Sequence, residues 1–229
     1  MAKGPAVSHP TILHRDDPDK PPLVGHVKVT RDDWLNVARD ILVSEGVGEV
    51  KVLGIAERLS VSRSSFYWYF KSRKDLLDQL LADWEHSNTG IMVAQTKLPA
   101  DTINAALNNF FRCVVDPQGF NHQLDFAVRE WARRDGSVRR IIDRSDSARK
   151  DAIAQMFERH GYAPDEADIR ARVLYYQQIG YYALDLSEAL EERLTRIAGY
   201  LYCFSGQHPT AEEVAEFSAF ARRVGQKRA

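Results

Sequence analysis

The stretch that decides the fold is VSRSSFYWYFKSRKDLL, residues 61–77. Five consecutive aromatic side chains stand in its middle, and three basic ones follow: Lys71, Arg73 and Lys74. If Ser62 caps a helix here, side chains turn by roughly 100° per residue, and Phe66 and Phe70 share one face. Trp68 then points almost directly away from that face. We therefore expect the two phenylalanines in the core and Trp68 in solvent, where a large aromatic side chain indicates a binding surface.

The charge around this segment has one sign. From residue 58 to residue 74 there are five basic side chains and no acidic one, although the whole chain has a net charge of −1. Cations and hydroxyl groups bind phosphate, while small and aromatic side chains meet base edges and thymine methyl groups. A short helix carrying Val52, Ile55, Ala56 and Leu59 precedes the segment, separated from it by a tight turn. This arrangement predicts a helix-turn-helix that binds duplex DNA.

The segment GIAERLSVSRSSFYWYFKSRKDLL resembles the DNA-binding signature of the tetracycline-repressor-like (TetR-family) transcriptional regulators. The resemblance covers about residues 30–84. It implies that Arg63 and Ser64 approach bases and that Arg73 clamps the DNA backbone. It also implies that phosphates are met by three hydroxyl side chains, Ser65, Tyr67 and Tyr69. With Trp68 and Lys71, these residues form the expected DNA-binding surface.

Two positions depart from the family pattern. Ser60 stands where the family usually has a turn glycine, so we expect a non-glycine residue at positive φ. Lys51 begins the second helix where a small hydroxyl residue is commoner. Lys51 is a candidate phosphate contact, although a cation at a helix N-terminus opposes the helix dipole.

The rest of the chain reads as all-α. Five of the nine prolines fall in the first 22 residues, so residues 1–26 are predicted to be a disordered tail. Helical periodicity then predicts a helix-turn-helix domain at 27–85. EHSNTG, residues 85–90, is expected to break the helical pattern before a larger domain at 86–229, whose longest helical stretches are 138–157 and 166–204.

Other classes of protein find little support in the sequence. No apolar run approaches the roughly 20 residues of a membrane span, and no secretion signal is evident, so a cytoplasmic location is expected. No nucleophile elbow or glycine-rich phosphate loop indicates an enzyme. The histidines are too scattered for a metal site, and no cofactor is expected.

The resemblance implies that the second domain encloses a small effector of unknown identity. Candidate lining residues are aromatic or polar side chains among its helices: Phe110, Phe126, Arg129, Trp131, Tyr175, Gln178, Tyr181 and Tyr182. Plain core packing is the alternative for the aromatic residues. Gln177, Gln178 and Arg129 favour a ligand, because buried polar atoms need partners.

A homodimer is predicted by two apolar stripes at helical spacing. VLYYQQIGYYAL, residues 173–184, contains no charge, and its apolar side chains point in every direction around the helix. The expected interface consists of Tyr176, Gly180, Ala183, Leu190, Leu194, Ile197 and Leu201. Packing of both stripes within one chain is the rival interpretation.

Three hypotheses follow. The first is a dimeric, effector-released repressor at a palindromic operator. The second is an architectural or chromosome-associated DNA-binding protein of the same fold without a ligand. The third is an all-helical enzyme or carrier in which the aromatic helix is only core.

Overall fold

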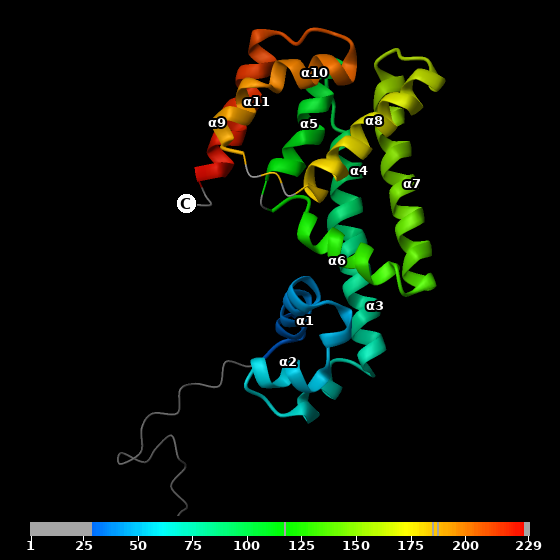
Figure 1. Ribbon diagram of the computed structural model, residues 1–229, viewed down its shortest axis with the longest axis vertical. Coiled ribbons are helices and arrows are strands. Elements are labelled where there is room, and N and C mark those ends of the chain that lie inside the picture. Colours follow the sequence, from blue (N-terminus) through cyan, green and yellow to red (C-terminus); the bar gives the residue numbers. More distant parts are fainter. Residues whose placement is uncertain (1–28, 117, 185, 187, 227–229) are drawn as a thin grey trace, which may run out of the picture.

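The computed structural model describes residues 29–116, 118–184, 186 and 188–226 (Figure 1). Within these ranges the regular structure is entirely helical and contains no strand, which confirms the all-α prediction. Among the described helices, none has the length and apolar character that a bilayer crossing needs. The predicted tail at 1–26 lies outside the described residues.

The N-terminal part is a small helical unit below the rest of the molecule in Figure 1. Its elements are α1 (Arg31–Glu45), the 3-10 helix η2 (Val47–Glu49), α2 (Val52–Arg58), the 3-10 helix η3 (Arg63–Trp68) and α3 (Arg73–Trp84). A capping box starts α1, because Thr30 and Asp33 satisfy each other's backbone N–H groups. Gly46, at φ 86°, ends it. The fully buried Trp34, Ile55 and Phe66 join these helices around one core.

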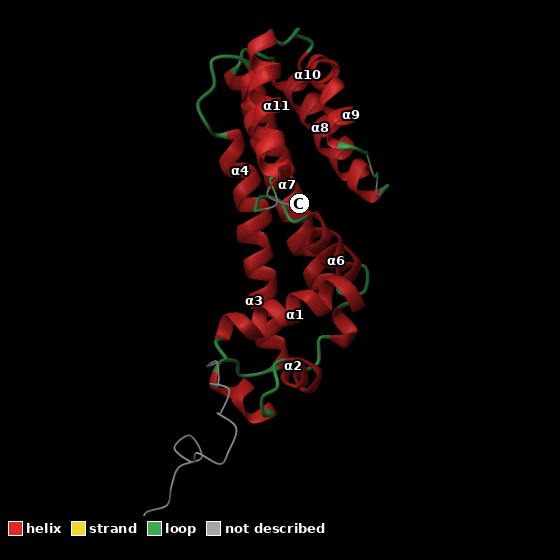
Figure 2. Ribbon diagram, turned by 90° about the vertical axis from the view of Figure 1, so that its left-hand side faces the viewer, coloured by secondary structure: helices red, strands yellow, loops and turns green. Residues whose placement is uncertain are grey.

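The expected break at EHSNTG is not a break. Residues Glu85–Gly90 form a π-helical segment, η4, that joins α3 directly to α4 (Ile91–Thr96), and Figure 2 shows the resulting long helix. The reason lies in tertiary packing, because Asn88 and Thr89 of η4 are buried. The Asn88 amide exchanges two hydrogen bonds with the backbone of Asn121. One helix therefore crosses the predicted boundary between 85 and 86.

The C-terminal part consists of α5 (Ile103–Val115), α6 (His122–Ala132), α7 (Gly136–Arg159), α8 (Pro164–Ala183), α9 (Leu190–Thr195), α10 (Ile197–Ser205) and α11 (Ala211–Gly225). α7 and α8 pack side by side as a long antiparallel pair (Figure 1). The second core cluster lies between α4, α5, α7, α8, α10 and α11, and contains Leu107, Phe157 and Leu174.

The predicted helical stretch at 166–204 is interrupted. α8 ends at Ala183, and the chain continues as the shorter helices α9 and α10. Beyond that end Leu184 and Leu186 are 71 % and 47 % exposed. Most helical stability in proteins comes from packing of an apolar face, and these residues supply no buried face.

Candidate functional site

The aromatic helix keeps the predicted inside and outside faces, but it is tighter than an α-helix. η3 is a 3-10 helix, the usual form of short helical pieces. Phe66 and Phe70 are 0 % and 2 % exposed and stack with ring centroids 5.2 Å apart. Trp68 is 80 % exposed and Tyr67 53 % exposed. The two buried rings anchor η3 on the core while Trp68 extends into solvent.

The turn before η3 has the strained backbone that the sequence predicted. Ser60 has a φ of 55°, and no other described non-glycine residue has a positive φ. The turn is held by backbone hydrogen bonds from Ser60 to Glu57 and from Val61 to Ala56, at 3.1 and 3.0 Å. The left-handed conformation thus sets the angle between α2 and η3.

Four of the predicted DNA contacts surround Trp68 on the outer surface. Arg63, Ser64, Tyr67 and Lys71 are all exposed. The Ser64 hydroxyl lies 2.8 Å from the Ser62 hydroxyl, and an Arg63 nitrogen lies 3.5 Å from the Tyr67 hydroxyl. These groups project cations and hydroxyls beside one exposed indole, as a phosphate- and base-binding surface requires.

The other four predicted contacts have partners within the chain. The Tyr69 hydroxyl donates to the Val29 carbonyl at 2.8 Å. The other three residues make four bonds: Ser65 donates to the Ser62 carbonyl, Lys51 donates to Glu49, and Arg73 donates to the carbonyls of Val50 and Val47. Arg73 thereby ties the start of α3 to the segment between α1 and α2. In the free chain these side chains hold the surface together, and DNA contact by them stays a prediction.

Comparison with known proteins agrees with this geometry. The family model described as bacterial regulatory proteins, tetR family, matches residues 35–80, from α1 into α3. Over these residues the chain is similar to regulators of the tetR family. Its relatives include the HTH-type transcriptional regulator AcrR of Shigella flexneri, 32 % identical over 79 residues. The uncharacterised HTH-type transcriptional regulator TtgW of Pseudomonas putida is 30 % identical over 62 residues.

The similarity in sequence is concentrated in the N-terminal part of the chain. The alignments cover 33 % and 27 % of the chain, and only 35 % of AcrR and 46 % of TtgW. The fold similarity extends further. A transcriptional regulator from Aquifex aeolicus VF5 superposes with a TM-score of 0.56 at 15 % identity, over 78 % of this chain and 96 % of that one.

A cavity lies within the C-terminal part of the chain. It has a volume of about 90 Å³ and is lined by residues of α5, α8, α9, α10 and α11. A larger hollow of about 540 Å³ adjoins it, near the connection from α5 to α6. The two share Val114, Tyr181 and Leu190 among their lining residues. We refer to the smaller hollow as the inner chamber and to the larger one as the outer chamber; both are open to solvent to a similar degree.

Three of the predicted effector residues line these chambers. Gln178 and Tyr181 line the inner chamber, while Tyr181 and Tyr182 line the outer one. The sequence analysis missed Asn108 and most of the apolar wall. An available signal was the spacing of Asn104 and Asn108, which recur on the apolar face of α5.

The other five predicted effector residues line neither chamber, and effector contact by them stays a prediction. Phe110 is fully buried in the second core cluster, and Trp131 belongs to the first, on the side of α1. Phe126 is half-buried on α6. Arg129 and Tyr175 are bound in an ionic network. Helical spacing indicated that these residues lie on inward faces of their helices. It did not indicate which of the two core clusters each face packs against.

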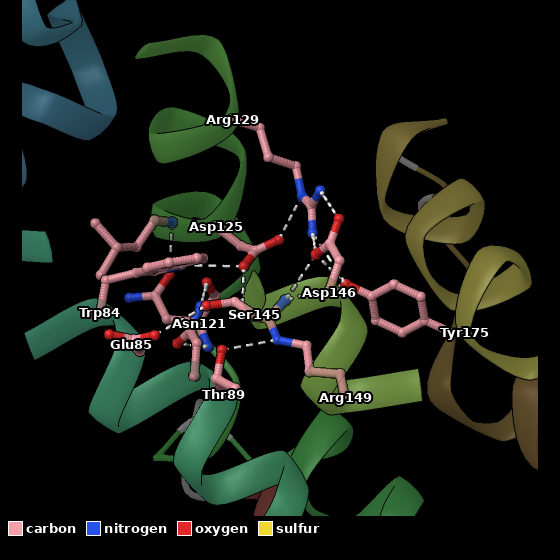
Figure 3. A network of polar contacts seen from close by, with 12 residues as sticks. Trp84, Glu85, Thr89, Asn121, Asp125, Arg129, Ser145, Asp146, Arg149 and Tyr175 are labelled. Carbon is pink, nitrogen blue, oxygen red and sulfur yellow. Dashed lines mark hydrogen bonds and ion pairs between the residues drawn. The ribbon is translucent and has the colours of Figure 1, made fainter. Parts of the chain in front are cut away.

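The ionic network joins α3, η4, α6, α7 and α8 (Figure 3). Arg129 binds Asp146 through two hydrogen bonds of 2.9 and 2.7 Å, and Asp125 through a third of 2.8 Å. The fully buried Arg149 donates to Asp125 at 3.0 Å and to the Tyr175 hydroxyl at 3.2 Å. Two cations face two carboxylates, so the buried charges compensate one another.

The network also reaches the helix that carries the DNA-binding unit. The Trp84 indole N–H at the end of α3 donates to Asp125 at 3.0 Å, and Arg149 donates to the Thr89 hydroxyl of η4 at 3.0 Å. The Arg149 guanidinium lies over the Trp84 ring, 5.3 Å from its centroid. A single set of contacts therefore connects α3 with α8.

Burial and charge act in opposite directions on the titrating groups of this network. Burial alone would raise the pKa of Asp146, but hydrogen bonds and the positive charge of Arg129 lower that pKa below its ordinary value. Burial raises the pKa of Tyr175 to about 12. At neutral pH Asp146 is therefore ionised and Tyr175 keeps its proton, as their hydrogen bonds in the network require.

The predicted dimer residues separate into two groups. Tyr176 and Ala183 are exposed on α8, and a Cβ added at Gly180 would meet no atom within 4 Å. The second stripe points inward, since Leu190, Leu194, Ile197 and Leu201 all line the inner chamber. In one chain the interruption between α8 and α9 lets this stripe pack against its own helices, and a dimer contact by these four residues stays a prediction.

Proposed function

We propose that the protein is a transcriptional regulator that binds duplex DNA through η3. The observation that carries this proposal is the 80 % exposed Trp68, fixed on a helix-turn-helix and flanked by Arg63 and Lys71. Trp68 is not a core residue, because Phe66 and Phe70 are the residues of this segment that are buried in the core. The apolar ring and the neighbouring cations match the base edges and phosphates of a major groove.

The protein binds as a homodimer through the outer face of α8. Ile169, Val173 and Tyr176 are 60 %, 53 % and 53 % exposed, and Gly180 and Ala183 continue the same stripe. Small residues let a second helix approach closely, and a two-fold axis places the same face on both partners. A dimer presents two copies of η3 to one side of a DNA duplex, so the operator is an imperfect palindrome.

A small effector bound in the chambers lowers DNA affinity, which makes the protein a repressor that works in the cytoplasm. Support comes from the cavity itself and from Tyr175, which lies one turn before the chamber residue Gln178 and is bonded into the ionic network. A ligand that shifts α8 acts through this network on α3. The alternative, an architectural DNA-binding protein without a ligand, has no use for the inner chamber.

The test begins with selection of bound fragments from a genomic library and measurement of affinity between about 50 and 200 mM salt. Each phosphate neutralised contributes about −0.9 to the slope of log affinity against log salt. Lys71→Ala weakens all DNA sequences alike and reduces this slope by about one unit. Lys97→Ala, an exposed lysine after α4, is the control and changes neither. A salt-independent affinity would exclude DNA as the partner.

A further inference from the structure

One arginine at the two chambers has no carboxylate partner among the described residues. Arg193, in the last turn of α9, lines both the inner and the outer chamber. Its guanidinium lies over the ring of Tyr181, 5.0 Å from the ring centroid, and Tyr181 also lines both chambers. The charged end of Arg193 therefore lies where the two chambers meet.

The N–H groups of Arg193 can be reached by a guest. A guanidinium carries five N–H donors, and its attraction to an aromatic ring does not use them in hydrogen bonds to oxygen. Within the described residues the Arg193 side chain makes no hydrogen bond and no ion pair. The side chain is only half-buried, and none of its nitrogens is among the inaccessible unpaired polar atoms of the described part. A molecule that enters the chambers thus finds these donors available.

The acidic side chains around Arg193 are paired with other arginines. Glu188 lines both chambers, and two further acids lie beside Arg193 on α9. The three ion pairs are Glu188–Arg196, Glu192–Arg196 and Glu191–Arg222. Because each of these carboxylates already has a cationic partner, the charge of Arg193 is available to an anion from outside the chain.

The wall of the inner chamber is mostly apolar. Its aromatic and aliphatic side chains include Phe111, Leu194, Leu201, Phe204 and Phe217. A cavity of about 150 Å³ with such a lining holds benzene, and the inner chamber has about 90 Å³. A slender alkyl chain therefore fits this chamber better than a ring.

We propose that the effector is an organic carboxylate with a slender apolar body, and that its carboxylate binds the Arg193 guanidinium while its apolar body lies in the inner chamber. The planar guanidinium suits a carboxylate, because two parallel N–H donors meet the two carboxylate oxygens. The proposal rests on the proposed function in one respect, because it names the chemical class of the effector that releases DNA. Binding of a carboxylate can be measured without DNA.

Three probes with matched alkyl chains test the proposal by isothermal titration calorimetry on the full chain. Hexanoate is the anion, hexanamide is its uncharged counterpart, and hexylamine is a cation at neutral pH. We expect hexanoate to bind about tenfold tighter than hexanamide, the lower end of the effect of hydrogen bonds to charged groups, because Arg193 is partly exposed to water. Hexylamine binds more weakly than both, since Arg193 repels it.

Variants assign this difference to Arg193. Arg193→Gln removes the charge, retains a polar side chain and abolishes the preference of hexanoate over hexanamide. Arg193→Lys keeps the charge and retains part of the preference.

The matched control is Arg223→Gln on α11. The Arg223 guanidinium lies over the ring of Phe220, 5.4 Å from the ring centroid, and it too has no carboxylate partner among the described residues. Arg223 lines neither chamber. Arg223→Gln therefore keeps the wild-type preference for hexanoate.

Three results with the wild type would overturn the proposal: hexanoate binding no tighter than hexanamide, hexylamine binding tightest, or no binding of any probe. A preference for hexanoate that survives in Arg193→Gln, or that is lost in Arg223→Gln, would also overturn it. The probe comparison needs no variant, so it decides the matter even if Arg193→Gln does not fold.

Failure of the proposed function is a separate result. It would appear as absent DNA binding, or as DNA affinity unchanged at saturating hexanoate, while the calorimetric preference for hexanoate persisted.

Discussion

At the scale of single residues, Phe66 and Trp68 show how two nearby aromatic positions take opposite roles. Phe66 is fully buried and contacts Trp34 edge to face, with ring centroids 5.3 Å apart. Trp68 is exposed and has no ring contact with another described aromatic residue. The buried Phe66 therefore stabilises the fold, whereas the exposed Trp68 is available to contact a partner.

Phe66→Ala should lower the free energy of unfolding by about 3–5 kcal/mol, because it leaves a cavity in the core of the N-terminal unit. Trp68→Ala should change that free energy by no more than about 0.5 kcal/mol, as exposed substitutions generally do, yet alter which DNA sequences are preferred. Urea denaturation and selection from a DNA library measure the two effects. A loss of stability in Trp68→Ala with unaltered preference would contradict the assignment.

Ser60 is the second residue with a distinct prediction. At φ 55° a side chain with a Cβ is strained by roughly 1–2 kcal/mol, whereas glycine adopts this conformation freely. Ser60→Gly relieves this strain, but glycine also gives the unfolded chain more conformational freedom, which offsets part of the effect. We therefore expect a net stabilisation of up to about 1 kcal/mol. Ser62→Gly is the control, since Ser62 has a φ of −70° and gains nothing. Urea midpoints compare the two variants, and equal shifts would rule out the strain.

At the scale of elements, the ionic network decides how the helices of the two parts meet. Asp125 of α6 and Arg149 of α7 are completely buried, and each also contacts the α3–η4–α4 helix. A π-helical segment inside a long helix often occurs at a functional site. Here η4 places Thr89 against Arg149, so the interruption of regular α geometry serves the network.

Arg149→Met should lower the free energy of unfolding by about 3–5 kcal/mol, because it leaves the Asp125 carboxylate buried with one cation fewer. The matched control is Arg139→Met on the same helix. Arg139 is exposed and pairs with Asp143 one turn away, an interaction that contributes at most about 0.5 kcal/mol. Chemical denaturation of both variants provides the measurement, and similar losses would show that the buried network adds no stability.

At the scale of the whole molecule, the stripe on α8 is an apolar face that the described part of one chain leaves exposed. Gly180 is informative because a Cβ added there meets no atom of the same chain within 4 Å. Leu194, by contrast, is 8 % exposed and lines the inner chamber, so a charge there would disturb the fold of one subunit. Assembly is therefore tested on α8 and not on α9.

Gly180→Leu should fold at least as stably as the wild-type subunit, because leucine favours a helix over glycine by up to about 1 kcal/mol. It should nonetheless abolish the dimer and operator binding, since each substitution enters a two-fold interface twice. Light scattering at micromolar concentration reports the mass. Leu98→Arg, at a 43 % exposed leucine away from α8, is the control and should remain dimeric. A wild-type mass of one subunit would refute the dimer.

The sequence by itself determined those features that depend only on residues close to one another along the chain. The helix-turn-helix, the buried Phe66 and Phe70 and the exposed Trp68 follow from periodicity and capping, whereas the positive φ of Ser60 was implied by the family resemblance. Tertiary structure decided which face meets which partner. Arg129 and Tyr175 joined an ionic network, Trp131 joined the N-terminal core, and Leu194 turned inward to a cavity. The physical reason is that helical spacing fixes the direction of a side chain on its own helix, whereas packing between helices far apart in sequence determines what lies in that direction.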